Sequence, residues 1–274
     1  METITTGDVS FPALGLGTWR LTDDQCVRAV EMALDLGYRH VDTAQAYGNE
    51  REVGTAIERS DVDREDVFLT TKLDWSNRRY DDVLRSTEES LARLGTSYVD
   101  LLLVHQPNPT VPLKETLDAM TDLRDAGKVR HVGVSNFSLS RLQRARDLST
   151  APIVTDQVMY HPYWDQTDLL DHCQIHDLVL TAYSPLAHGS AIGDDRLAEI
   201  GERYGKSAAQ VALRWLVQQA NVAVVPKATS REHLAANREI FDFELTPAEM
   251  RAVHRPSKLR TALGFVQSRL PGSA

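Results

Sequence analysis

Short apolar segments recur along the whole chain and predict eight β-strands. Each segment is rich in valine and leucine and lacks a regular alternation of apolar and polar residues. Such continuous apolar runs are typical of parallel strands that are buried on both faces. The predicted strands cover residues 13–19, 40–44, 68–73, 99–105, 129–136, 154–159, 178–185 and 222–228.

Stretches with helical periodicity alternate with these strands. In residues 23–37, Val27, Val30 and Leu34 fall on one face of a helix, and Gly37 is a stop signal. The same kind of pattern predicts helices at residues 49–59, 80–95, 113–127, 138–149, 167–177, 207–220 and 230–241.

Residues 246–255 predict an additional C-terminal helix. Thr246 supplies an N-cap, Pro247 a proline at the first helical position, and Glu249, three residues after the cap, the second partner of a capping box. Eight strand–helix units without a flexible linker predict one (β/α)8 TIM barrel domain over residues 1–274.

The alternative α/β fold is a doubly wound open sheet. Its first strand is usually followed by G-x-G-x-x-G, whereas Gly15 and Gly17 provide only G-x-G and Trp19 follows them. Turn glycines explain this segment better than a phosphate-binding loop, so we favour the barrel.

Charge and cysteine content narrow the functional class. The net charge of −9, from 30 basic and 39 acidic residues, argues against nucleic acid or an anionic membrane as a partner. No apolar run is long enough to span a bilayer, and the first twelve residues lack the features of a signal peptide. Two cysteines, Cys26 and Cys173, indicate a reducing compartment. We therefore expect a cytoplasmic enzyme.

Polar side chains stand where the predicted strands end. Functional residues of a (β/α)8 barrel collect at the C-terminal ends of its strands, so these positions are the candidate site. They are Asp42, Tyr47, Lys72, His105, Ser135, Asn136, Gln157, Tyr183, Ser184 and Lys227.

Lys72 and Asp42 are expected to pair, because a lone ammonium at the barrel mouth is costly to desolvate. A buried salt bridge that only closes the barrel explains these two residues equally well. Tyr47 favours acid–base chemistry, because a nearby ammonium lowers the pKa of a phenol from about 10 and improves it as a proton donor. His105 is placed to orient a substrate carbonyl. Alone, Tyr47 is also explained by loop packing and His105 by a structural role, but the four residues together favour a site.

A phenol beside an ammonium suits carbonyl reduction, because hydride addition leaves negative charge on oxygen. No side chain donates hydride, so a nicotinamide is required. Ser135, Asn136 and Gln157 can hydrogen-bond a carboxamide, and Tyr183 offers a flat face for stacking. Lys227 precedes the predicted helix 230–241, where barrels commonly bind phosphate.

Seven segments carry a resemblance to a known family. They are GYRHVDTAQAYGNEREVG (37–54), TTKL (70–73), LLLVHQP (101–107), VGVSNF (132–137), DQVMYHPY (156–163), AYSPL (182–186) and VVPK (224–227). In their order and spacing the chain resembles the aldo-keto reductase family over almost its whole length. The short tail and the short loop after Lys72 are most similar to prokaryotic members that reduce small dicarbonyls and keto acids.

The resemblance implies a monomeric, NADPH-dependent reductase of aldehydes or ketones. Asp42, Tyr47, Lys72 and His105 would form its catalytic tetrad, with Tyr47 as the general acid in reduction. Trp19 and Trp75 are expected as aromatic walls of the substrate pocket, with core packing as the alternative. The cofactor-binding residues that the resemblance implies are Ser135, Asn136, Gln157, Tyr183, Ser184, Leu186, Lys227, Thr229, Ser230, His233 and Asn237.

Two departures from the family pattern bear on cofactor choice. Ala228 replaces a serine, and His233 stands where an arginine usually binds the 2′-phosphate. A neutral histidine does not provide the bidentate fork of an arginine, so we expect NADH to be accepted besides NADPH. Lys227 still favours NADPH, and Arg231 is a candidate substitute for the missing arginine. A third departure is Gln106, which follows the catalytic histidine where a tryptophan is common.

Two other functions remain open at this stage. An aldolase would use Lys72 as a Schiff base, but this requires a neutral lysine and Asp42 would keep Lys72 charged. A non-catalytic nicotinamide-binding subunit is the other, and the intact tetrad argues against it. A metal site is not expected, because the strand ends lack His-x-His or clustered carboxylates.

Overall fold

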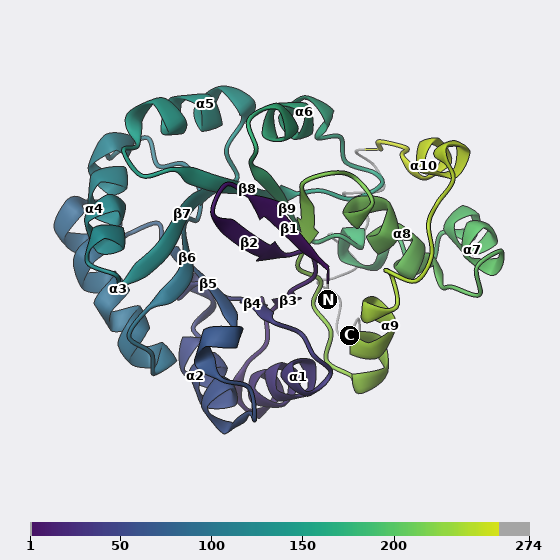
Figure 1. The fold of residues 1–274 in the computed structure, drawn as a ribbon, viewed down its shortest axis with the longest axis horizontal. Coiled ribbons are helices and arrows are strands. Elements are labelled where there is room, and N and C mark those ends of the chain that lie inside the picture. The colour runs from purple at the N-terminus through teal and green to yellow at the C-terminus, as the bar shows by residue number, and fades with distance from the viewer. Residues whose placement is uncertain (1, 258–274) are drawn as a thin grey trace.

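Eight parallel strands form one sheet in the computed structural model, which describes residues 2–257 (Figure 1). Their order in the sheet follows the order in the chain, as expected for successive strand–helix units. They are β3 (Leu16–Gly17), β4 (His40–Asp42), β5 (Phe68–Leu73), β6 (Val99–Val104), β7 (Val129–Ser135), β8 (Ile153–Met159), β9 (Val179–Tyr183) and β10 (Val222–Val224). All eight predicted strands are confirmed.

The first and last strands meet and close the sheet into a barrel. Leu14 forms a parallel bridge with Val224, and the Gly15 amide donates a hydrogen bond of 2.8 Å to the Val224 carbonyl. A Cβ atom on Gly17 would lie 2.6 Å from the Val225 carbonyl oxygen. Gly17 therefore permits close strand approach at the closure, which explains a glycine there without a phosphate-binding loop.

The helices surround the barrel (Figure 1). The nine predicted helices are confirmed as α1 (Asp23–Asp35), α2 (Glu50–Arg59), α3 (Tyr80–Leu94), α4 (Leu113–Asp125), α5 (Leu139–Leu148), α6 (Thr167–Ile175), α8 (Ala208–Val217), α9 (Arg231–Arg238) and α10 (Pro247–Val253). The capping box at the start of α10 is present, with Thr246 accepting from the Glu249 amide and Glu249 accepting in return. Three short 3-10 turns are η1 (Gln45–Tyr47), η2 (Arg64–Asp66) and η3 (Ala187–Gly189).

One helix and one two-stranded hairpin were not predicted. Helix α7 (Asp195–Glu202) has only eight residues, and the Asp194 side chain caps it by accepting from two backbone amides. Strands β1 (Thr3–Thr6) and β2 (Val9–Pro12) form an antiparallel hairpin of four-residue strands. Helix α7 is no shorter than α9, but its start lacks the capping box and the proline that mark α10. Strand β1 contains a single apolar residue, Ile4, so no apolar run marks the start of the hairpin.

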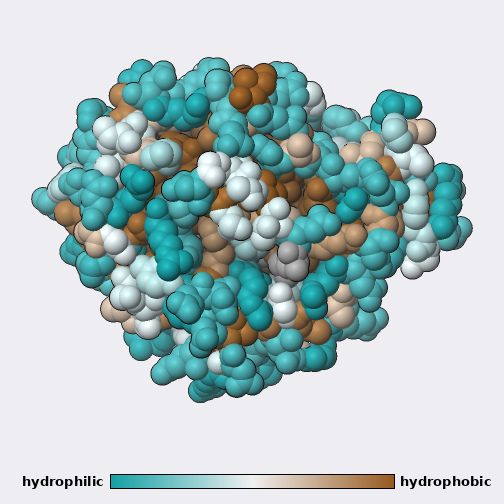
Figure 2. Space-filling view, viewed as in Figure 1, coloured by the Kyte–Doolittle hydropathy of each residue, from teal (hydrophilic) through white to brown (hydrophobic). Residues whose placement is uncertain are grey.

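The hairpin closes the N-terminal end of the barrel. Phe11 is fully buried, and its ring contacts the rings of His40 and Phe68, which are the first residues of β4 and β5. On the face seen in Figure 2, hydrophilic residues dominate and hydrophobic residues form only small separated areas. The opposite, C-terminal end of the barrel is left to carry the polar side chains of the candidate site.

No helix within residues 2–257 combines the length and apolar character that crossing a lipid bilayer requires.

Candidate active site

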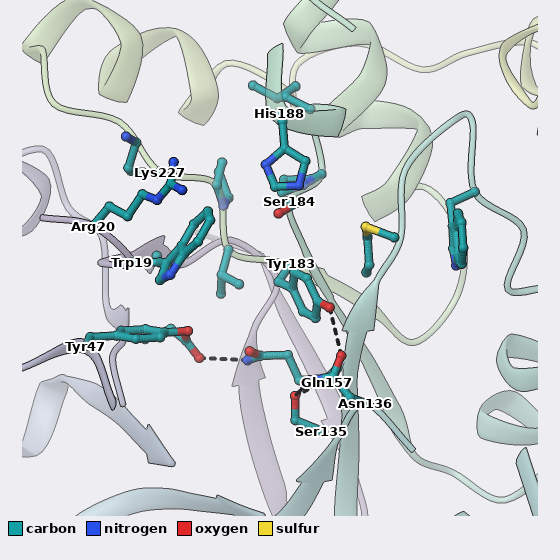
Figure 3. A pocket seen from close by; sticks show the side chains of 18 of the residues that line it. Trp19, Arg20, Tyr47, Ser135, Asn136, Gln157, Tyr183, Ser184, His188 and Lys227 are labelled. Atoms are coloured by element: carbon teal, nitrogen blue, oxygen red, sulfur yellow. Dashed lines mark hydrogen bonds between the residues drawn. The ribbon is translucent and has the colours of Figure 1, made fainter. Parts of the chain in front are cut away.

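A cavity of about 1050 Å³ opens at the C-terminal ends of the strands (Figure 3). The structure brings together most of the side chains that the sequence singled out. The predicted residues that line the cavity are Trp19, Asp42, Tyr47, His105, Ser135, Asn136, Gln157, Tyr183, Ser184, Leu186 and Lys227. Lys72 lies beneath them and is fully buried.

Asp42, Tyr47 and Lys72 form a connected group. The Lys72 Nζ donates to Asp42 Oδ1 at 2.5 Å, to the Thr43 carbonyl at 2.9 Å and to the Tyr47 hydroxyl at 3.4 Å. The side chains of Lys72 and Asp42 are only 1% and 4% exposed. All three donor positions of the ammonium are therefore used, and one of them points at the phenol.

Burial and charge act in opposite directions on the pKa of each partner. Burial lowers the pKa of Lys72, but the charges of Asp42 and Tyr47 outweigh it and leave the pKa raised, so the lysine stays protonated. Burial raises the pKa of Tyr47, and the nearby Lys72 lowers it by less, so the net direction is upward. The expectation that Lys72 brings this phenol below its ordinary pKa is wrong for the protein alone, because desolvation of the phenolate is the larger effect.

His105 lies edge-on to Tyr47, with 5.8 Å between the ring centroids. Burial and the charge of Lys72 lower the pKa of His105 to about 4. The imidazole is therefore neutral near pH 7 and offers a hydrogen bond without competing with Tyr47 as a proton source.

Ser135, Asn136 and Tyr183 form a hydrogen-bonded group on another side of the cavity (Figure 3). The Tyr183 hydroxyl donates to Asn136 Oδ1 at 2.7 Å, and Asn136 Nδ2 donates to Ser135 Oγ at 3.0 Å. Gln157 Nε2 donates to Asp42 Oδ2 at 2.7 Å, which links Gln157 to the Lys72 group. The face of Tyr183 is held in place by these contacts and borders the cavity.

Arg20 lines the cavity together with Lys227, and the two lie beside each other in Figure 3. Burial and the neighbouring Arg20 lower the pKa of Lys227. Two cations that share one wall favour an anionic ligand. Sequence reasoning missed Arg20, although its place directly after the first predicted strand, 13–19, was the available signal.

The other residues implied for the cofactor lie on or before α9 and outside the cavity lining. Ser230 caps α9 by accepting from the His233 amide at 3.2 Å, and the His233 side chain is exposed. Thr229 is half-buried, and Asn237 is buried against Tyr38. Arg231, the candidate substitute for the missing arginine, forms an ion pair of 2.7 Å with Asp35.

Of the two predicted aromatic walls, Trp19 lines the cavity and Trp75 does not. Trp75 is 42% exposed, and its carbonyl accepts a hydrogen bond from Asn108. Trp164, Met159 and Ile192 also line the cavity and were not predicted. Met159 is the last residue of β8, whereas Trp164 and Ile192 lie in loops beyond β8 and β9, whose paths the hydrophobic pattern does not define.

Comparison with known proteins agrees with this architecture. The sequence profile of the aldo/keto reductase family matches residues 13–257. An aldo-keto reductase of Mycolicibacterium smegmatis is 41% identical over 246 residues, with 89% of each chain covered. Methylglyoxal reductase DkgB of Salmonella typhi is 37% identical over 248 residues, covering 89% of this chain and 92% of that protein.

A similar solved structure supports the same assignment. It is a protein assigned as a 2,5-diketo-D-gluconic acid reductase B, with a TM-score of 0.91 and 46% sequence identity. The match covers 100% of this chain and 93% of the other. With its parallel barrel, the cavity at the strand ends and these relatives, the chain belongs to the aldo/keto reductase family.

Proposed function

We propose that this enzyme reduces the carbonyl group of small aldehydes, ketones or dicarbonyls with NADPH, and that Tyr47 supplies the proton. The observation that carries the proposal is the phenol of Tyr47 at 3.4 Å from a buried, charged Lys72, on the wall of a large cavity. We also propose that residues 1–274 act as one domain and as a monomer.

The residues around the cavity fit a nicotinamide dinucleotide. Tyr183 offers a flat face near Asn136 and Gln157, whose carboxamides can pair with that of a nicotinamide. Arg20 and Lys227 provide positive charge for phosphate groups elsewhere on the wall. When bound, the reduced nicotinamide would supply the hydride that no amino-acid side chain can give.

The catalytic roles follow from the charges and contacts. Tyr47 donates its proton to the carbonyl oxygen as negative charge develops there. Lys72 stabilises the phenolate that remains, and Asp42 keeps Lys72 charged and in place. Neutral His105 orients the carbonyl by a hydrogen bond.

The same geometry disfavours a Schiff-base aldolase. A nucleophilic amine must be neutral and accessible, whereas Lys72 has a raised pKa and a side chain that is only 1% exposed. The similarity to methylglyoxal reductase DkgB makes small dicarbonyls the first substrates to test.

The test is a panel of carbonyl compounds assayed with NADPH and with NADH, on the wild type and on Tyr47→Phe. We expect turnover of at least one small dicarbonyl, and a rate at least about a hundredfold lower in Tyr47→Phe, the scale of a lost general acid. Full activity in Tyr47→Phe would refute the assignment of the proton donor. Absence of turnover with every carbonyl and both cofactors would refute the proposed reaction itself.

A further inference from the structure

Near the catalytic tetrad, the side chain of Gln45 makes four hydrogen bonds. Its Oε1 accepts from the Asp74 amide at 2.7 Å and from Asn77 Nδ2 at 3.0 Å. Its Nε2 donates to the Ser86 carbonyl and to Ser90 Oγ, both at 3.1 Å. The carboxamide thus uses both acceptor positions and both donor positions.

The orientation of this carboxamide is determined by the backbone. The Asp74 amide can only donate and the Ser86 carbonyl can only accept, so Oε1 and Nε2 of Gln45 cannot exchange places. The side chain therefore fits one arrangement of the segment after β5 and of helix α3.

Gln45 and Tyr47 lie on the same short turn, η1. Two backbone hydrogen bonds form this turn: the Tyr47 amide donates to the Ala44 carbonyl, and the Gly48 amide donates to the Gln45 carbonyl. Gly48, which follows it, has a left-handed φ of 69°. The backbone of so short a turn does not fix its own position, so contacts with neighbouring elements must do so.

Two side chains hold the turn from opposite directions. Asn49 donates to the carbonyls of Thr18 and Leu21, on the side of β3. Gln45 binds the other side, where Asp74 follows Lys72 by two residues at the end of β5. Gln45 thus joins the turn that carries the phenol to the strand that carries the ammonium.

We propose that Gln45 is a positioning residue for carbonyl reduction, holding the Tyr47 hydroxyl at its short distance from Lys72 by binding η1 to the segment after β5 and to α3. This inference rests on the proposed function, since it assigns Gln45 a role through the proton donor. A proton transfer is sensitive to displacements of about 1 Å, which can change a rate by about a hundredfold.

The experiment compares Gln45→Leu with Gln218→Leu. Gln218 is a matched control, because its carboxamide contacts Leu245 twice and Arg214 once and lies outside the cavity lining. Each substitution is made in the wild type and in Tyr47→Phe, and methylglyoxal reduction by NADPH is measured. We expect Gln45→Leu to lower kcat by about ten- to a hundredfold with less than about a threefold change in the KM for methylglyoxal. In Tyr47→Phe the same change should cost less than about twofold, because residues that act as a unit are not additive.

Asn77→Ala keeps the test valid if Gln45→Leu does not fold. It removes one of the four hydrogen bonds to Gln45 and should lower kcat by a few-fold. As for Gln45→Leu, the loss should disappear when the substitution is made in Tyr47→Phe. An equal loss with and without the Tyr47 hydroxyl, or a loss no larger than that of Gln218→Leu, would overturn the inference. A wild type that reduces no carbonyl of the panel with either cofactor would instead refute the proposed function.

Discussion

At one end of the cavity Lys72 and Asp42 are almost completely buried, and the lysine contacts an acid, a carbonyl and a phenol. At the other end Arg20 and Lys227 are exposed, and the first turn of α9 presents the exposed imidazole of His233 where the family pattern has an arginine. Removing a partner at the first end leaves a buried charge without compensation, whereas solvent screens any change at the second. Under the proposed function, the difference predicts that buried contacts determine the reaction, while exposed residues, whose substitution costs little stability, determine the choice of cofactor.

The largest effect is expected from Lys72→Met. It should lower the rate of carbonyl reduction more than about a hundredfold, because the phenolate of Tyr47 loses its cation. It should also lower the free energy of unfolding by about 3–5 kcal/mol, because Asp42 remains buried without its partner. Urea denaturation and steady-state kinetics measure the two effects. Lys114→Met, at an exposed ion pair with Asp118, is the control and should change stability by less than about 1 kcal/mol. Equal stability losses in the two variants would show that the buried Lys72–Asp42 pair contributes no more stability than an exposed ion pair.

A smaller effect is expected from Lys227→Met. It removes one of two cations from the cavity wall and should raise the KM for NADPH by about tenfold, which corresponds to about 1.4 kcal/mol. The value of kcat should change by less than about twofold, because we assign Lys227 to phosphate binding and not to the proton transfer. Lys128→Met, on an exposed ion pair with Glu88, should leave both constants unchanged. A loss confined to kcat would show that the two ends are not independent.

A still smaller shift is expected from His233→Arg. An arginine at this exposed position can bind the 2′-phosphate as a fork, so the preference for NADPH over NADH should rise by about fivefold. The measurement is the ratio of kcat/KM for the two cofactors. If the wild type already prefers NADPH by more than about a thousandfold, Arg231 or another group supplies the missing contact and our view of this end is wrong.

The smallest change concerns acid pH. His105 has a pKa of about 4, so it stays neutral above that value and gains a positive charge near Lys72 only as the pH falls through it. The kcat/KM of reduction should therefore vary by less than about twofold between pH 5 and pH 8. An acid limb centred near pH 6.5, the ordinary pKa of histidine, would show that burial does not control this residue.

Much of the fold could be predicted, because most strands contain a clear apolar run and most helices a clear helical periodicity. All eight barrel strands and nine helices follow from apolar runs and helical periodicity, and Thr246 and Glu249 marked the start of α10 correctly. The hairpin β1–β2 was missed because β1 has a single apolar residue, and helix α7 because its start lacks the capping box and the proline that mark α10.

The candidate site was predicted as far as strand ends define it. Asp42, Lys72 and Tyr47 meet because parallel strands place their ends on one rim. Trp164 and Ile192 could not be foreseen, because loop paths depend on tertiary contacts. The direction of the Tyr47 pKa shift could not be predicted either. Burial raises this pKa and the 3.4 Å contact with Lys72 lowers it, and the sequence does not show which effect is larger.

The central claim is that the Tyr47 phenol is the proton donor, and the alkaline limb of the pH profile tests it most directly. The kcat/KM for carbonyl reduction would be followed from pH 7 to pH 11 in the wild type and in Tyr47→Phe. Because burial raises the pKa of Tyr47, we predict that the wild type keeps its activity up to about pH 10 and loses it above. Tyr47→Phe should be at least about a hundredfold slower and should lack this limb. The same limb in both proteins, at similar rates, would contradict the account.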